Sequence, residues 1–148
     1  MEHPLSVRRR ILPDDAQVQI VLGSLLGDAR IEGPAGARCV RITHSLARAD
    51  YVWWKYERLV QFADGAPARL GADGMPARLG DRIGFRTIAH PLFDDLAPLF
   101  VTHRGTRSRV VRDLLAPLGL AVWMTDIGRL ELRPDLFLPR QRDLALCA

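Results

Sequence analysis

The sequence contains little cysteine, almost no lysine and no long apolar run, and each scarcity excludes a class of protein. Two cysteines, Cys39 and Cys147, are too few for a disulfide framework and lack the paired spacing of a zinc site, so they suit reduced thiols. No apolar run reaches the roughly 18 residues of a membrane-spanning helix. The arginine triplet at 8–10 has no apolar segment after it, unlike a secretory signal. The sequence therefore predicts a cytoplasmic protein without a membrane partner, or an organellar one in a eukaryote.

Arginine supplies nearly all of the positive charge. Lys55 is the single lysine among 21 basic side chains, and the formal net charge is +4. A guanidinium group can bind two phosphate oxygens at once, so this balance favours a nucleic-acid partner. Genome composition alone would produce the same bias, and charge does not prove the partner.

The chain divides into three predicted parts. Residues 1–13 form a loose basic leader, residues 14–116 a first folding unit, and residues 117–148 a second unit that begins with another apolar helix. Within the first unit, residues 63–71 recur at 72–80 with eight of nine positions identical. We interpret the segment 63–80 as a loop with a local duplication, because insertions in loops cost little.

Hydrophobic periodicity predicts an α+β fold. In the helix around Tyr51 and Trp54 these two side chains face the core, whereas Lys55 lies largely outside. In the two central strands the apolar residues alternate with arginines on a polar face. The expected helices span 15–26, 48–62, 91–100, 106–115 and 118–126, and the expected strands span 30–32, 38–44, 82–88 and 129–133.

The most informative segment, residues 21–29, is an apolar helix end that contains two glycines and one carboxylate. Gly23 and Gly27 lie four residues apart on one helix face, although each glycine costs about 1 kcal/mol relative to alanine. Such a face lets a second helix approach closely, so both are predicted interface residues. Asp28 follows at the tip of this contact. A hard oxygen ligand fixed there could bind a divalent cation, or it could simply end the helix.

Polar residues on or near the predicted strands form a second candidate set. Arginine commonly pairs with guanine, and most protein–DNA contacts go to the backbone. Ordinary solvated surface is the alternative interpretation. The DNA-binding candidates are Arg30, Arg38, Arg41, Thr43, Arg82 and Arg86.

Four segments, in order along residues 14–137, resemble the LAGLIDADG homing endonuclease family in its intron-type, two-motif branch. Residues 23–29 look like the end of the family's signature helix, and residues 118–128 look like its second signature helix. Residues 44–59, from His44 and Ser45 onward, are similar to the family's segment after its second strand. Residues 85–93 are similar to the strand and helix start of the next unit.

The resemblance implies an αββαββα saddle in which two signature helices pack at the centre, within one chain as a pseudo-dimer or across a homodimer. It implies antiparallel sheets over the major groove of double-stranded DNA. It also implies an acid at the foot of each helix that binds Mg²⁺ or another divalent cation and supports phosphodiester hydrolysis at a long specific site. Asp28 matches the first acid, and Asp126 is the candidate for the second catalytic and metal-binding position.

Two features depart from the family pattern. Ile127 occupies the position of the second acid, and Asp126 precedes it by one residue, a rotation of about 100° on a helix. Too few residues follow Gly128 for a complete second half, so we expect an incomplete second unit. The sequence thus predicts a metal-dependent homing endonuclease, limited to nicking if one acid acts alone. The alternative is a catalytically degenerate DNA-binding or RNA maturase-like protein.

Overall fold

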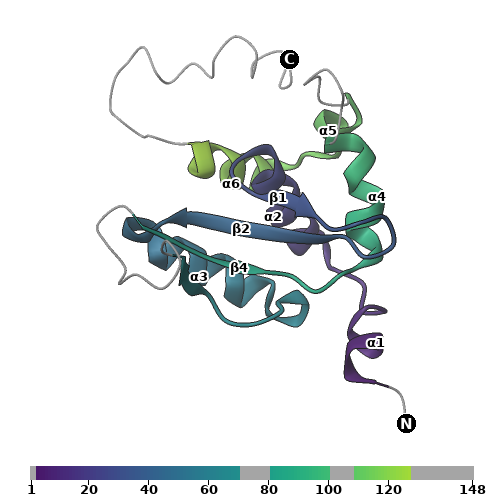
Figure 1. The fold of residues 1–148 in the computed structure, drawn as a ribbon. Coiled ribbons are helices and arrows are strands. Elements are labelled where there is room, and N and C mark those ends of the chain that lie inside the picture. Colours follow the sequence, from purple (N-terminus) through teal and green to yellow (C-terminus); the bar gives the residue numbers. More distant parts are fainter. Residues whose placement is uncertain (1–2, 71–80, 101–108, 128–148) are drawn as a thin grey trace.

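Helices and strands alternate along the chain and build one antiparallel sheet with helices packed on it (Figure 1). The computed structural model describes residues 3–70, 81–100 and 109–127. The predicted α+β class is confirmed. The elements are α1 (Pro4–Arg8), α2 (Asp15–Leu26), β1 (Arg30–Glu32), β2 (Cys39–Ser45), α3 (Ala49–Arg58), β3 (Ala68–Leu70), β4 (Arg82–Arg86), α4 (Pro91–Phe100), α5 (Arg109–Leu114) and α6 (Pro117–Ile127).

The sheet has the strand order β1-β2-β4-β3, and every neighbouring pair is antiparallel. Ile42 on β2 lies opposite Phe85 on β4, and both side chains are buried beneath the helices. The intervening residues Arg41 and Arg86, also opposite each other, project from the other face. The alternation predicted for these two strands is therefore confirmed, and it separates an apolar inner face from a basic outer face.

Strand β3 corrects the prediction that residues 63–80 form a loop. Ala68–Leu70 pairs with β4 inside the first copy of the repeat. All three residues of this edge strand are exposed, and three residues are too few for the alternation over four or more from which a strand is predicted. The second copy of the repeat and the predicted strand 129–133 lie outside the described residues.

The basic leader, which the sequence predicts to be loose, is instead folded against the rest of the chain. It contains the short helix α1, and Arg8 ties that helix to the turn that follows α3. The Arg8 guanidinium donates from Nε to the Gln61 carbonyl at 3.0 Å and from Nη2 to the Ala63 carbonyl at 2.6 Å. This docking could not be predicted from the sequence, because backbone carbonyls carry no side-chain signature.

Helix α2 begins and ends where the sequence predicts. The Asp14 side chain accepts a hydrogen bond from the Gln17 amide, and the Gln17 side chain in turn accepts one from the Asp14 amide. This reciprocal pair is a capping box, which satisfies two amides that the first helical turn leaves without partners. The predicted helix 48–62 is shorter: α3 ends at Arg58 and is flanked by 3-10 turns.

Helices α2 and α6 lie side by side and form the most extensive helix pairing in the described structure (Figure 1). Val122 of α6 shares one hydrophobic core with Ile20 and Leu22 of α2 and with the inner face of the sheet. None of the helices in the described part of the chain has the length and apolar character needed to cross a bilayer.

Glycines make this helix pair possible. A Cβ on Gly23 would overlap the Gly119 carbonyl and the Val122 side chain, and a Cβ on Gly27 would overlap Asp126. Both glycines of α2 therefore lie against α6 of the same chain.

We expect Gly23→Ala to lower the free energy of unfolding. Alanine gains about 1 kcal/mol of helix propensity. Overpacking against a backbone carbonyl, which cannot rotate away, costs about 1–3 kcal/mol. Thermal and denaturant unfolding measure the balance, with Ala121→Leu on the exposed side of α6 as the control. Unchanged or increased stability of Gly23→Ala would contradict the tight packing.

Candidate functional site

The two candidate acids meet where α2 and α6 end. Asp28 follows α2 and keeps its side chain 46% exposed, whereas the Asp126 side chain at the end of α6 is fully buried. The Asp28 amide donates to Asp126 Oδ2 at 3.3 Å. The structure thus brings the two acids together but gives them different surroundings.

The Asp126 carboxylate is held by Lys55 and Tyr51, both from α3. Lys55 Nζ donates to Asp126 Oδ1 at 2.6 Å, and the Tyr51 hydroxyl donates to the same oxygen at 2.8 Å. Burial lowers the pKa of the Lys55 ammonium, and the adjacent Asp126 carboxylate opposes that shift. Burial and Asp126 both raise the pKa of Tyr51. The charge of Asp126 is therefore balanced inside the protein.

The position of Lys55 contradicts the expectation that its side chain lies on the surface of the protein. Its side chain is 0% exposed, and its partner Asp126 is 71 residues away in sequence. A helical pattern places a lysine on the outside by default, because only a distant counter-ion makes burial of an ammonium tolerable.

His44, on the inner face of β2, lies between the two acids. Its residue is 1% exposed, its Nε2 is 3.2 Å from Lys55 Nζ, and its Nδ1 is 3.3 Å from Asp28 Oδ2. Burial and the Lys55 charge lower the pKa of His44 to about 4, so the ring is neutral near pH 7. No functional role was predicted for His44 from the sequence. Another buried histidine, His90, lies elsewhere and packs between Phe62 and Phe93. The histidine at position 103 lies outside the described residues.

Arg48 closes the C-terminal end of α6. Its guanidinium donates to the Thr125 carbonyl and, at 3.3 Å, to the Asp126 carbonyl, and it lies 5.0 Å from the centre of the Tyr51 ring. A cation at a helix C-terminus is favourable because the last carbonyls lack partners within the helix.

Sequence reasoning missed four members of this cluster: His44, Arg48, Tyr51 and Lys55. A usable signal existed for three of them. Arg48, Tyr51 and Lys55 are spaced three and four residues apart, which places them on one side of a helix. Nothing local indicated that this side faces a carboxylate.

The exposed carboxylate of Asp28 is a single oxygen ligand that a cation could reach. Within the described residues, no three His, Cys, Asp or Glu side chains come together as a cation site. Mg²⁺ does not require such a cage, since it keeps several waters and commonly takes one or two carboxylates plus substrate phosphates. At the matching end of α6 the exposed side chain is Ile127, 46% exposed, which offers no oxygen.

The outer face of the sheet carries a row of three arginines. Arg30 lies opposite Arg41, and Arg41 lies opposite Arg86. Like charges opposite each other on a sheet are destabilising. Arg82 lies further along the same face and donates to the Thr43 hydroxyl at 3.0 Å. These five of the six predicted DNA-binding residues share one surface, which we call the arginine face.

Acidic neighbours orient two members of this face. Arg41 Nε donates to Glu32 Oε1 at 2.7 Å, and Arg86 Nη2 donates to Asp64 Oδ2 at 3.2 Å. The sixth candidate, Arg38, is not part of it. Arg38 precedes β2 and lies 3.7 Å from Asp94 of α4.

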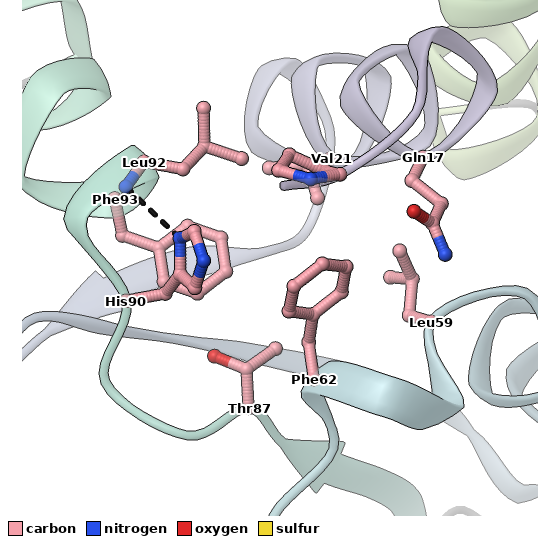
Figure 2. A pocket seen from close by; sticks show the side chains of 9 residues that line it. Gln17, Val21, Leu59, Phe62, Thr87, His90, Leu92 and Phe93 are labelled. Atoms are coloured by element: carbon pink, nitrogen blue, oxygen red, sulfur yellow. Dashed lines mark hydrogen bonds between the residues drawn. The ribbon is translucent and has the colours of Figure 1, made fainter. Parts of the chain in front are cut away.

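A separate small cavity lies beneath α2 (Figure 2). Its lining is mostly apolar, including Val21, Leu59, Phe62 and Phe93, and the space measures about 10 Å³. His90 lines one side and accepts a hydrogen bond from the Leu92 amide at 3.1 Å. A cavity of this size holds about one water at most, so it is a packing defect rather than a ligand site.

Comparisons with known proteins agree with the resemblance drawn from the sequence. The model of the LAGLIDADG DNA endonuclease family matches residues 18–147. A solved structure of the homing endonuclease I-WcaI bound to its DNA recognition sequence matches the fold with a TM-score of 0.67 at 15% sequence identity. The match covers 82% of this chain and 56% of that one, so this chain spans little more than half of that endonuclease. A comparison with curated proteins gives no match.

The buried ion pair predicts a large loss of stability for Lys55→Met. Asp126 would keep a buried charge without a counter-ion, which costs about 3–5 kcal/mol. Denaturant unfolding gives the value. The double variant Lys55→Met/Asp126→Leu should recover much of the loss, because an apolar pair needs no compensation. A single variant that unfolds like the wild type, or a double variant no better than the single, would show that the pair is not the main constraint.

Proposed function

The chain belongs to the LAGLIDADG DNA endonuclease family, and on that premise we propose that it binds duplex DNA through the arginine face and hydrolyses one strand at Asp28. One observation carries the proposal. Of the two carboxylates at the helix junction, only Asp28 is exposed, whereas Asp126 is buried and paired with Lys55.

The arginine face supports the DNA-binding part. Arg30, Arg41 and Arg86 form a basic row on the outer sheet surface, and with only Glu32 and Asp64 bound to them among the described residues the row keeps a positive balance that favours an anionic partner. The phosphate backbone of DNA is such a partner, and guanidinium groups bind its oxygens bidentately. Arg82 and Thr43 extend the surface along the same strands. Arg38 takes no part in this proposal because it faces Asp94.

Asp28 is the proposed metal ligand. Its exposed carboxylate would bind one Mg²⁺ or a similar divalent cation, with water and a DNA phosphate completing the shell. When bound, the cation supplies a more acidic water and stabilises charge on the phosphate oxygens. The chain's own contribution is to hold the backbone of Asp28 at the foot of two packed helices.

Asp126, the second candidate from the sequence, is proposed to act indirectly. Its Oδ2 accepts from the Asp28 amide, so it fixes the backbone that carries the ligand. Its Oδ1 is occupied by Lys55 and Tyr51. Among the described residues, Ile127 is the exposed side chain beside it and offers no oxygen, so we propose that cleavage is limited to one strand.

A second candidate function is DNA binding without cleavage, as in a degenerate or maturase-like relative. Ile127 favours it, because an exposed apolar side chain stands where the family pattern has an acid.

As for assembly, we propose a monomer. A homodimer through Gly23 and Gly27 would have to displace α6, which fills that face in the same chain.

We expect the protein to convert supercoiled plasmid to open circles in the presence of Mg²⁺. The plasmid would carry duplexes recovered by binding selection from a random pool. Asp28→Asn should abolish nicking while retaining DNA binding, because it removes only the exposed carboxylate. Linear product would contradict one-strand cleavage. Binding by the wild type with unchanged plasmid would support the second candidate.

The arginine face predicts a specific salt dependence of DNA binding. Each lost phosphate contact should reduce the slope of log K against log salt by about 0.9. We expect this for Arg41→Gln and for Arg86→Gln, measured by fluorescence anisotropy on a selected duplex. Arg58→Gln on α3, across the core from the arginine face, is the matched control. Equal slopes for all three variants and the wild type would remove the arginine face from the interface.

A further inference from the structure

We propose that His44 is a positioning residue that holds one oxygen of the Asp28 carboxylate and leaves the other for the cation. The inference rests on the proposed function of Asp28. It goes further by assigning a role to a buried side chain that touches neither DNA nor metal.

The hydrogen-bond chemistry of Lys55 fixes the state of the His44 ring. An ammonium group can only donate, and Lys55 Nζ lies 3.2 Å from His44 Nε2. His44 Nε2 must therefore accept, which in a neutral ring places the proton on Nδ1. The same lysine also donates to Asp126, so its position is fixed from two sides. Lys55 thus selects one tautomer of His44.

That tautomer directs a buried donor at Asp28. His44 Nδ1 lies 3.3 Å from Asp28 Oδ2, yet it has no aligned hydrogen-bond partner. Buried polar atoms without partners are rare and need an explanation. The Asp28 side chain is 46% exposed and has room to turn. A small rotation of the carboxylate completes the bond, in the way that contacts at reaction sites tighten when a ligand binds.

A carboxylate held in this way is a better cation ligand than a free one. The bond from Nδ1 engages Oδ2 and fixes the plane of the carboxylate, so Oδ1 remains for the cation. Hydrogen bonds of this kind to metal-ligating carboxylates typically change metal affinity by about 10–100-fold. The contacts run from the end of α6 to the end of α2, from Asp126 to Lys55, from Lys55 to His44 and from His44 to Asp28.

Two substitutions distinguish the roles of the two ring nitrogens of His44. The amide nitrogen of asparagine lies near the position of histidine Nδ1, so His44→Asn keeps a donor toward Asp28. Glutamine reaches the position of Nε2, so His44→Gln keeps the contact with Lys55 and loses the donor. Both remove the ring and should affect stability alike, which thermal unfolding checks.

The readout is Tb³⁺ binding to the full chain, measured by luminescence sensitised by nearby aromatic side chains. Asp28→Asn defines the signal that belongs to Asp28. We expect His44→Gln to weaken that binding about tenfold or more, and His44→Asn to stay close to the wild type. Equal weakening in both variants, or none in either, would overturn the role of His44 while leaving the proposed function standing. A wild type with no Asp28-dependent signal would overturn the metal-binding proposal itself.

The tautomer gives a test that needs no variant. Two-dimensional ¹H–¹⁵N spectra of the wild type distinguish a ring protonated at Nδ1 from one protonated at Nε2. We expect the Nδ1-protonated form for His44 near pH 7. The Nε2-protonated form would overturn the inference even if both variants failed to fold.

Discussion

The buried ion pair between Lys55 and Asp126 is the constraint on which the rest of the helix junction depends. Two charges removed from water are tolerable only when their hydrogen-bonding capacity is filled, because the desolvation penalty of each is several kcal/mol. Tyr51 and His44 supply the remaining partners at 2.8 Å from Asp126 and 3.2 Å from Lys55. The pair therefore ties α3, α6 and β2 into one arrangement. It also explains why the single lysine of the chain is not on its surface.

The same pair makes the two helix ends unequal. α2 and α6 approach each other through glycine, and each ends next to an aspartate, so the sequence alone presents them as near equivalents. In the structure the Lys55 ammonium lies 2.6 Å from Asp126, whereas the group that faces the Asp28 carboxylate at 3.3 Å, within the described residues, is the neutral ring of His44. A cation is attracted to the carboxylate whose charge is not yet balanced. The asymmetry is thus electrostatic as well as steric, and it follows from one buried ammonium group.

Local chemistry made much of this fold predictable. The start of α2 follows from the pair Asp14 and Gln17, and the two central strands follow from apolar alternation, because these signals lie within a few residues of the features they determine. What could not be predicted depends on partners distant in sequence. Lys55 is buried because of a residue 71 positions away, and the edge strand β3 exists because β4 offers it hydrogen bonds. The candidate site divides in the same way. Asp28 could be predicted from the motif that contains it, whereas His44 lies next to Asp28 only because the chain folds.

The register of β2 connects the two halves of the site. Side chains alternate along a strand, so Arg41 projects to the arginine face while His44, three residues later and about 10 Å along the strand, projects to the helix junction. A slip of one residue would bury Arg41 and expel His44 from between the two acids. Val40 and Ile42, the buried apolar residues of β2, oppose such a slip, since it would expose both side chains. The core of the sheet therefore determines more than stability. It determines both which guanidinium groups face outward and which imidazole lies next to Asp28. Strand β2 therefore positions the arginine face and the carboxylate at the helix junction relative to each other.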